Sequence, residues 1–234
     1  MSPLSKRRAF TLVELLVVIA VIGILVGSLG LALSNGDRGV AMQGAQSSLS
    51  ALVSGARAQA ALNLSNASIV VWGDKDDPET YLRRAAVMVN VKPAVGAAFW
   101  VRKGDVVELP TGIYFVPPDA SGSLPAKFEK PADWSSLKYT ESSSLNPTSL
   151  DVRLSESASS SAAEKITVKG YVSVGFNAYG QITASAVNTM MVATGELQPP
   201  ADGIIFKNAE SVRGLVVSTY GISTLINEKL GFKP

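Results

Sequence analysis

The sequence predicts an α+β protein in which one long N-terminal helix packs on a C-terminal antiparallel β-sheet domain. Residues 10–64 contain no proline and carry apolar side chains at helical spacing. After residue 64, short apolar runs alternate with turn residues, a pattern typical of strands. With 234 residues, 47% of them hydrophobic, the chain is long enough to bury a core without disulfides or a structural metal.

The first half of the predicted helix is long enough to cross a membrane. A helix over residues 10–33 rises about 1.5 Å per residue and covers the roughly 30 Å hydrocarbon core. The basic residues Lys6, Arg7 and Arg8 precede it, which predicts a cytoplasmic N-terminus by the positive-inside rule. A secretory signal peptide, an uncleaved anchor and a processed anchor are the alternatives. The apolar run is longer than the usual signal-peptide core of about 7–15 residues.

Glu14 is the one charged residue within 10–33. A carboxylate in a lipid-spanning helix is costly, although less so near the interface. If the chain were cut between Ala9 and Phe10, the new amino group on Phe10 would lie close to Glu14. The two groups would then form a charge pair, either within one chain or between adjacent subunits.

The leader and the start of the helix closely resemble the prepilin signal of type IV pilins and pseudopilins. The resemblance covers the stretch Lys6-Arg7-Arg8-Ala9-Phe10-Thr11-Leu12-Val13-Glu14-Leu15 and the apolar residues up to Leu25. It implies removal of residues 1–9 by a prepilin peptidase, N-methylation of Phe10, and assembly with other pilin subunits through an inner-membrane platform. The family usually has glycine before the cut. Because Ala9 is also small, we expect the chain still to be processed.

Small residues line one face of the predicted helix, including Gly23, Gly27 and Gly30. Such a face lets helices approach closely, although about half of residues 20–58 are small, so composition alone is the competing explanation. Residues 34–64 form the amphipathic half. Its predicted apolar face consists of Ala45, Leu49, Leu52, Val53, Ala56 and Ala60, and its predicted polar face includes Gln43, Gln46 and Arg57. Two glycines and an Asn-Gly pair in 34–39 predict a kink or a melted turn.

Residues 65–234 are expected to form the β-rich domain. Strands are predicted at 68–72, 81–91, 99–102, 106–109, 112–116, 166–168, 171–176, 182–186, 190–194, 203–206, 212–219 and 222–226. The stretch 117–165 is rich in Ser and Pro and is predicted to be a long loop, with a short strand near 150–154.

Short segments of this domain are similar to the H-type (GspH) minor pseudopilins and the FimT minor pilins. They are the helix end at 49–60, the strand and turn at 107–113, and the paired segments 174–180 and 213–221. The resemblance implies a minor subunit of a filament.

The composition excludes most catalytic machinery. The chain has no histidine and no cysteine, so Ser-His-Asp triads and thiolate sites are absent. We expect no enzyme activity and no cofactor. The acidic run 74–79 fits no calcium loop and is interpreted as a solvated turn, so no metal is expected. Trp134, in the polar stretch, is the candidate for an exposed contact.

The leading hypothesis is a structural subunit of a type IV pilus-like or type II secretion filament. It would sit in the bacterial inner membrane in contact with lipid, with its β-domain in the periplasm, before it enters the filament. The alternatives are a minor pilin that binds DNA or a secreted substrate at a filament tip, and an uncleaved anchored domain. Nucleic-acid binding would use two basic pairs, Arg83-Arg84 and Arg102-Lys103, which lack an obvious stacking platform.

Overall fold

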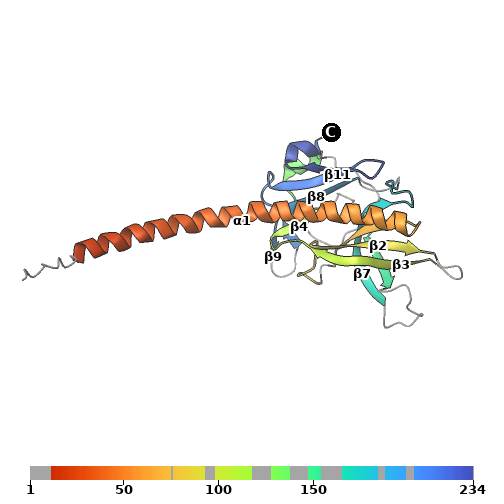
Figure 1. Cartoon of the computed structure of the whole chain (residues 1–234), viewed down its shortest axis with the longest axis horizontal. Helices are drawn as coiled ribbons and strands as arrows, with labels where there is room; N and C mark the ends of the chain where they lie inside the picture. The colour runs from red at the N-terminus through yellow and green to blue at the C-terminus, as the bar shows by residue number, and fades with distance from the viewer. Residues whose placement is uncertain are drawn as a thin grey trace, which may run out of the picture. The chain divides into compact units, whose positions relative to one another are not determined.

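The computed structural model describes residues 12–74, 76–92, 98–117, 128–137, 147–153, 165–183, 188–198 and 203–233. The chain divides into two compact units, Met1–Val40 and Ala41–Pro234. Helix α1 (Leu12–Leu62) contributes to both (Figure 1). Of the two alternatives predicted at 34–39, a kink or a melted turn, the melted turn was wrong, because α1 continues through these residues. Each glycine in a helix interior costs about 1 kcal/mol, but propagation from the flanking turns is cooperative and offsets that cost.

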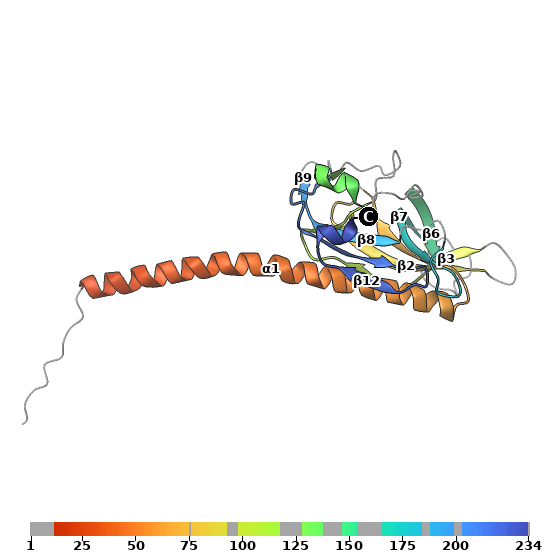
Figure 2. The ribbon, with the colours of Figure 1, turned by 90° about the horizontal axis from the view of Figure 1, so that it is seen from above.

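The described residues of the second unit form a closed barrel and two further sheets. The closed barrel contains β1 (Ala67–Trp72), β2 (Arg84–Val91), β3 (Phe99–Glu108), β6 (Pro147–Arg153) and β7 (Lys165–Phe176). A four-stranded sheet has the order β12 (Ser223–Ile226), β11 (Val212–Val217), β8 (Thr189–Thr194), β4 (Ile113–Phe115). A three-stranded sheet has the order β5 (Phe128–Glu129), β10 (Gly203–Ile205), β9 (Glu196–Gln198). Barrel strands β3 and β7 lie at the opposite end of this unit from β9 (Figure 1, Figure 2).

The α+β prediction is confirmed, whereas the prediction of an antiparallel β-sheet domain holds for most but not all of the strand pairs. Most pairs are antiparallel, but β3 pairs with β6, and β5 with β10, in parallel. The strands predicted at 99–102 and 106–109 form one continuous strand, β3, and those predicted at 166–168 and 171–176 form β7. The stretch 117–165 is not wholly loop, because β5, a 3-10 helix (η1, Ala132–Ser136) and β6 fall within it. Another 3-10 helix, η4 (Lys229–Phe232), lies near the C-terminus.

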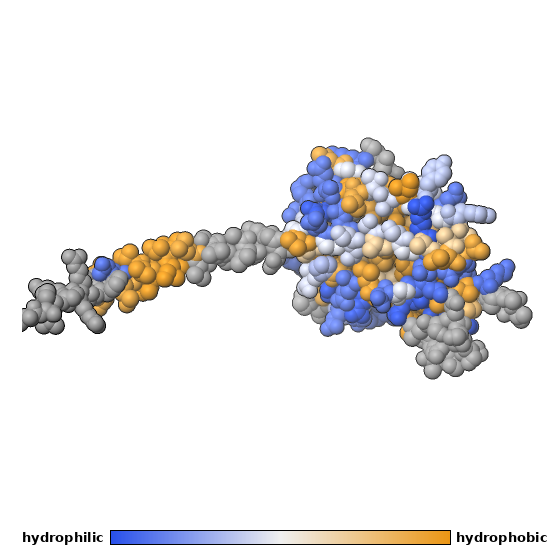
Figure 3. All heavy atoms as spheres, viewed as in Figure 1, coloured by the Kyte–Doolittle hydropathy of each residue, from blue (hydrophilic) through white to orange (hydrophobic). Residues whose placement is uncertain are grey.

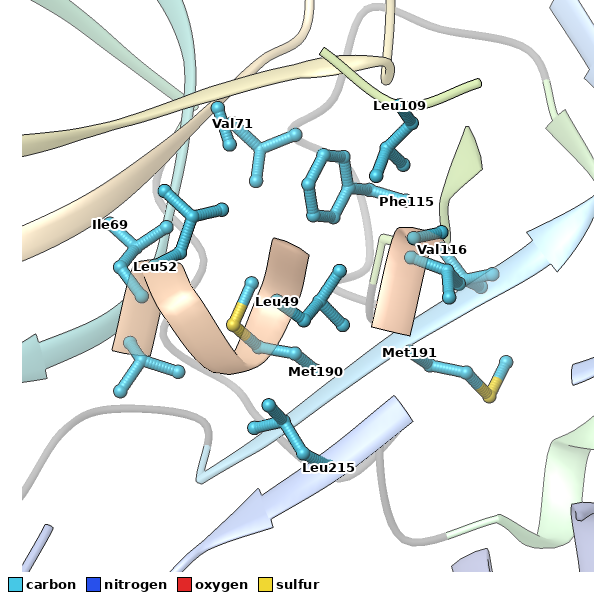
Figure 4. Packing of buried hydrophobic residues seen from close by; sticks show 14 of the residues in the cluster. Leu49, Leu52, Ile69, Val71, Leu109, Phe115, Val116, Met190, Met191 and Leu215 are labelled. Atoms are coloured by element: carbon cyan, nitrogen blue, oxygen red, sulfur yellow. The ribbon is translucent and has the colours of Figure 1, made fainter. Parts of the chain in front are cut away.

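The main core forms where α1 meets both the barrel and the four-stranded sheet. Leu49 and Leu52 point into a cluster with Ile69 of β1, Met190 of β8 and Leu215 of β11 (Figure 4). All six residues of the predicted apolar face are buried: Ala45, Leu49, Leu52, Val53, Ala56 and Ala60. The alternate face of the barrel strands forms a second, smaller cluster of Val70, Ala86, Met88, Val152 and Val168. In a closed barrel this second face is the interior.

Candidate functional site

The predicted processing site falls outside the described residues. Lys6, Arg7, Arg8, Ala9 and Phe10 all precede Leu12, where the described helix begins.

Glu14 lies in the first turn of α1. A carboxylate there is favoured by the partial positive charge at a helix N-terminus.

The first unit presents its large apolar side chains to the outside. From Leu12 to Leu25 these side chains are between 49% and 80% exposed, and Figure 3 shows them as an apolar surface. A Cβ added to Gly23 would have no neighbour within 4 Å, while Gly27 and Gly30 are helical and no more is described of them. Within the described residues, none of the helices combines the length and apolarity needed to span a bilayer.

The domain half of α1 holds one buried polar side chain that the sequence assigned to the wrong face. Gln46 is 4% exposed. Its Nε2 donates to the carbonyl oxygens of Gly214 on β11, at 3.0 Å, and Ile226 on β12, at 2.9 Å. The side chain therefore ties the helix to the backbone of two strands. In the sequence, Gln46 has the same helical spacing as the exposed polar residues around it. Its role is seen only from its hydrogen-bond partners, which lie 168 and 180 residues away.

The two basic pairs are not brought together as one cationic surface. Arg83 and Arg84 share Glu108, with nitrogen–oxygen distances of 3.3 Å and 2.9 Å. Arg83 also donates to the carbonyl of Leu109 at 3.0 Å and is largely buried. Arg102 lies six residues before Glu108 on β3, opposite Met88. The single carboxylate of Glu108 offsets one of the two positive charges of this pair, which weakens the case for a nucleic-acid surface.

The described residues of the acidic run 74–79 form a hydrogen-bonded turn. Asp74 accepts the backbone N–H of Asp76 and pairs with Lys169 at 2.9 Å, and this contact raises the pKa of Lys169. Asp77 accepts the hydroxyl of Thr80 at 2.7 Å. Among the described residues, no group of three or more acidic side chains has the geometry to hold a metal ion.

Trp134 is not an exposed contact, and that prediction was wrong. Its side chain is 0% exposed, its Nε1 donates to the carbonyl of Ala209 at 3.0 Å, and its ring lies 5.5 Å from that of Phe206. The prediction failed because it was based on the polar residues around Trp134, whereas the tryptophan itself is buried against distant segments. Trp72 and Trp100 are partly buried and pack against the smaller cluster.

The comparisons with known proteins bear on the N-terminus. Residues 4–30 match the family model described as the prokaryotic N-terminal methylation motif. The chain carries a prepilin-type signal. No curated protein and no solved structure matches it. The matched range includes every residue of the predicted prepilin processing site, Glu14 and the three glycines, and it supports the type IV pilin and pseudopilin family.

Proposed function

We propose that the protein is a structural subunit of a type IV pilus-like or type II secretion filament and not an enzyme. The observation that carries the proposal is the methylation motif at residues 4–30. Prepilin peptidase would cut between Ala9 and Phe10, and Phe10 would be N-methylated. Before assembly the helix would hold the chain in the bacterial inner membrane, with the N-terminus cytoplasmic and the β-domain in the periplasm.

Assembly would be driven by the apolar start of α1. Its exposed leucine, isoleucine and valine side chains need an apolar environment, which lipid supplies first and neighbouring helices supply in the filament. Glu14 would pair with the Phe10 amine of a neighbour and so fix the axial offset between subunits. Close approach of the helices would occur along Gly23, Gly27 and Gly30. The second unit would form the outer surface of the filament, because its helix face seats a β-rich domain.

The processing step is tested by the intact mass of the full chain extracted from membranes of its host. We expect a chain that begins at N-methylated Phe10. A chain that still begins at Met1 would contradict the proposal.

Glu14→Ala separates assembly from processing. We expect normal cleavage but a roughly tenfold or greater loss of filament incorporation, since an unpaired ammonium in an apolar bundle costs several kcal/mol. The measurement is the ratio of sheared-filament to membrane-bound protein. Glu14→Asp, which keeps a carboxylate at this position, is the matched control and should retain most of the incorporation. Normal incorporation of Glu14→Ala would exclude the charge pair.

A further inference from the structure

Two turns of the same design lie side by side at one end of the second unit. In the first, Gly180 N–H donates to the carbonyl of Asn177 at 2.9 Å; in the second, Gly221 N–H donates to that of Ser218 at 2.8 Å. Both glycines have positive φ, 72° and 77°, a conformation that favours glycine. A hydrogen bond from Ile182 N–H to the carbonyl of Thr219, 3.1 Å, joins the turns.

Each turn carries a tyrosine immediately before its glycine. Tyr179 is 85% exposed and Tyr220 is 68% exposed, and the adjacent Ile222 is 59% exposed. Large exposed aromatic side chains on rigid turns are typical of contact residues, because little conformational freedom is lost on binding.

Arg57 of α1 lies against both turns. A Cβ on Gly180 would come within 3.0 Å of Arg57 Cγ, and one on Gly221 within 3.1 Å of Arg57 Cδ. The two glycines therefore leave room for the aliphatic stem of the arginine, whose side chain is exposed. Arg57 forms no ion pair with a carboxylate of the described residues. We call Arg57, Tyr179, Tyr220 and Ile222 the arginine–tyrosine end.

The acidic turn offers the complementary charge. Asp74 and Asp77 are used within the turn, but Asp76 and Glu79 are exposed. Of the described residues, none forms an ion pair with the carboxylate of Glu79. The exposed proline-containing turn thus presents a carboxylate that a cation of another molecule can reach.

The register of β1 places these two features at opposite ends of the unit. Ala67, at the start of β1, pairs with Phe176, which immediately precedes the first tyrosine turn. Trp72, at the other end of β1, immediately precedes the acidic turn. A strand of this length spans about 20 Å at about 3.3 Å per residue, so Arg57 and Glu79 of one chain are too far apart to pair.

We propose that the arginine–tyrosine end of one copy of this chain docks on the acidic turn of the next copy, with Arg57 paired to Glu79. The contact joins two different surfaces, so it is heterologous, and a heterologous contact that does not close into a ring generates an open filament. This inference rests on the proposed function and adds a contact between β-domains to the one between helices.

Cysteine cross-linking tests the contact directly, because the chain contains no cysteine. The full chain would carry Thr219→Cys at the tyrosine end and Asp76→Cys at the acidic turn, both exposed positions. Membranes and sheared filaments would be treated with a short bis-maleimide. We expect a ladder of dimers, trimers and longer products from the double variant and no ladder from either single variant.

Gln198→Cys with Asp76→Cys is the control pair, since Gln198 is exposed on β9, which belongs to the three-stranded sheet and to neither turn. A ladder from the control pair but none from the test pair would overturn the inference. Dimers from Thr219→Cys alone would also overturn it, because they would show like ends meeting. If the chain is processed and enters filaments yet the test pair stays monomeric, the inference fails and the proposed function stands. An unprocessed chain would instead contradict the proposed function.

A charge exchange identifies the ion pair. In the double-cysteine chain, Arg57→Glu should lower ladder formation about tenfold, because it places like charges together. Adding Glu79→Arg to the same chain should restore the ladder, since the two charges are then exchanged. Arg213→Glu, a charge reversal on β11, is the control and should leave the ladder unchanged. Failure of the exchange to restore the ladder would exclude the Arg57–Glu79 contact.

Discussion

Gln46 shows how one polar side chain can fix the position of a helix on a sheet. The helix is otherwise held by apolar contacts, which resist separation but allow sliding. Gln46 adds directional hydrogen bonds to two backbone carbonyls on adjacent strands, β11 and β12. A buried carbonyl that loses its donor costs the full desolvation penalty, so the side chain specifies one register of helix against sheet.

Replacing Gln46 by methionine preserves its volume and removes both hydrogen bonds. We expect the free energy of unfolding to fall by about 2–3 kcal/mol, since two buried carbonyls lose their donor. Denaturant unfolding of the full chain in detergent, followed by circular dichroism, would measure it. Gln43→Met, at an exposed position on the same helix, should change the stability by less than about 0.5 kcal/mol. Equal effects of the two substitutions would refute this role.

At the scale of elements, the 3-10 helix η1 is fixed by its contacts with two distant segments. Trp134 inserts beside Phe206 and donates to Ala209. Lys229 of η4 contacts both Asp133 of η1 and Glu210, and the hydrogen bond to Glu210 raises the pKa of Lys229. Three segments that are far apart in sequence are thus joined near the C-terminus.

Trp134→Ala tests this junction. We expect a loss of about 3–5 kcal/mol, as for other fully buried large aromatic side chains. Trp134→Phe keeps a ring against Phe206 but loses the hydrogen bond to Ala209. The lost hydrogen bond should lower the free energy of unfolding by about 1 kcal/mol, in addition to the cost of the smaller ring. Thermal unfolding of both variants provides the comparison. A tryptophan whose removal leaves the melting temperature unchanged would not be the anchor of η1.

Sequence patterns predicted which residues form helices and strands better than they predicted which elements pack or pair with one another. The buried face of α1 followed from periodicity alone, because an amphipathic helix has to bury its apolar stripe. The parallel pairs β3–β6 and β5–β10 join strands that are not neighbours in sequence, and no local pattern encodes such a pairing. Trp134 and Gln46 were misplaced for the same reason, since their partners lie 75 and at least 168 residues away. The signal at residues 4–30 is local and was therefore recognised.

At the scale of the whole molecule, the β-rich unit buries tyrosines that resist ionisation. Burial raises the pKa of Tyr81 and of Tyr171 above the ordinary value of 10.0. Burial also raises the pKa of Tyr114, although the positive charge of the nearby Arg83 partly lowers it. The hydroxyl of Tyr81 has no hydrogen-bond partner among the described residues. In the unfolded chain these groups ionise near pH 10, whereas in the folded chain they remain neutral to higher pH.

The protein should therefore unfold in alkali through these groups. Their folded pKa lies above the unfolded one, so their contribution is fully present below about pH 10 and is lost as the pH rises further. Two tyrosines that ionise only on unfolding give a slope of about 3 kcal/mol per pH unit above pH 10. The slope is obtained from the free energy of unfolding, measured with denaturant at several pH values between roughly pH 8 and pH 12. Replacing Tyr81 and Tyr171 together by phenylalanine should flatten it, whereas Tyr179→Phe, at an exposed ring, should not. If the double variant keeps the full slope, alkaline unfolding has another origin, and the buried tyrosines do not set the upper pH limit of this fold.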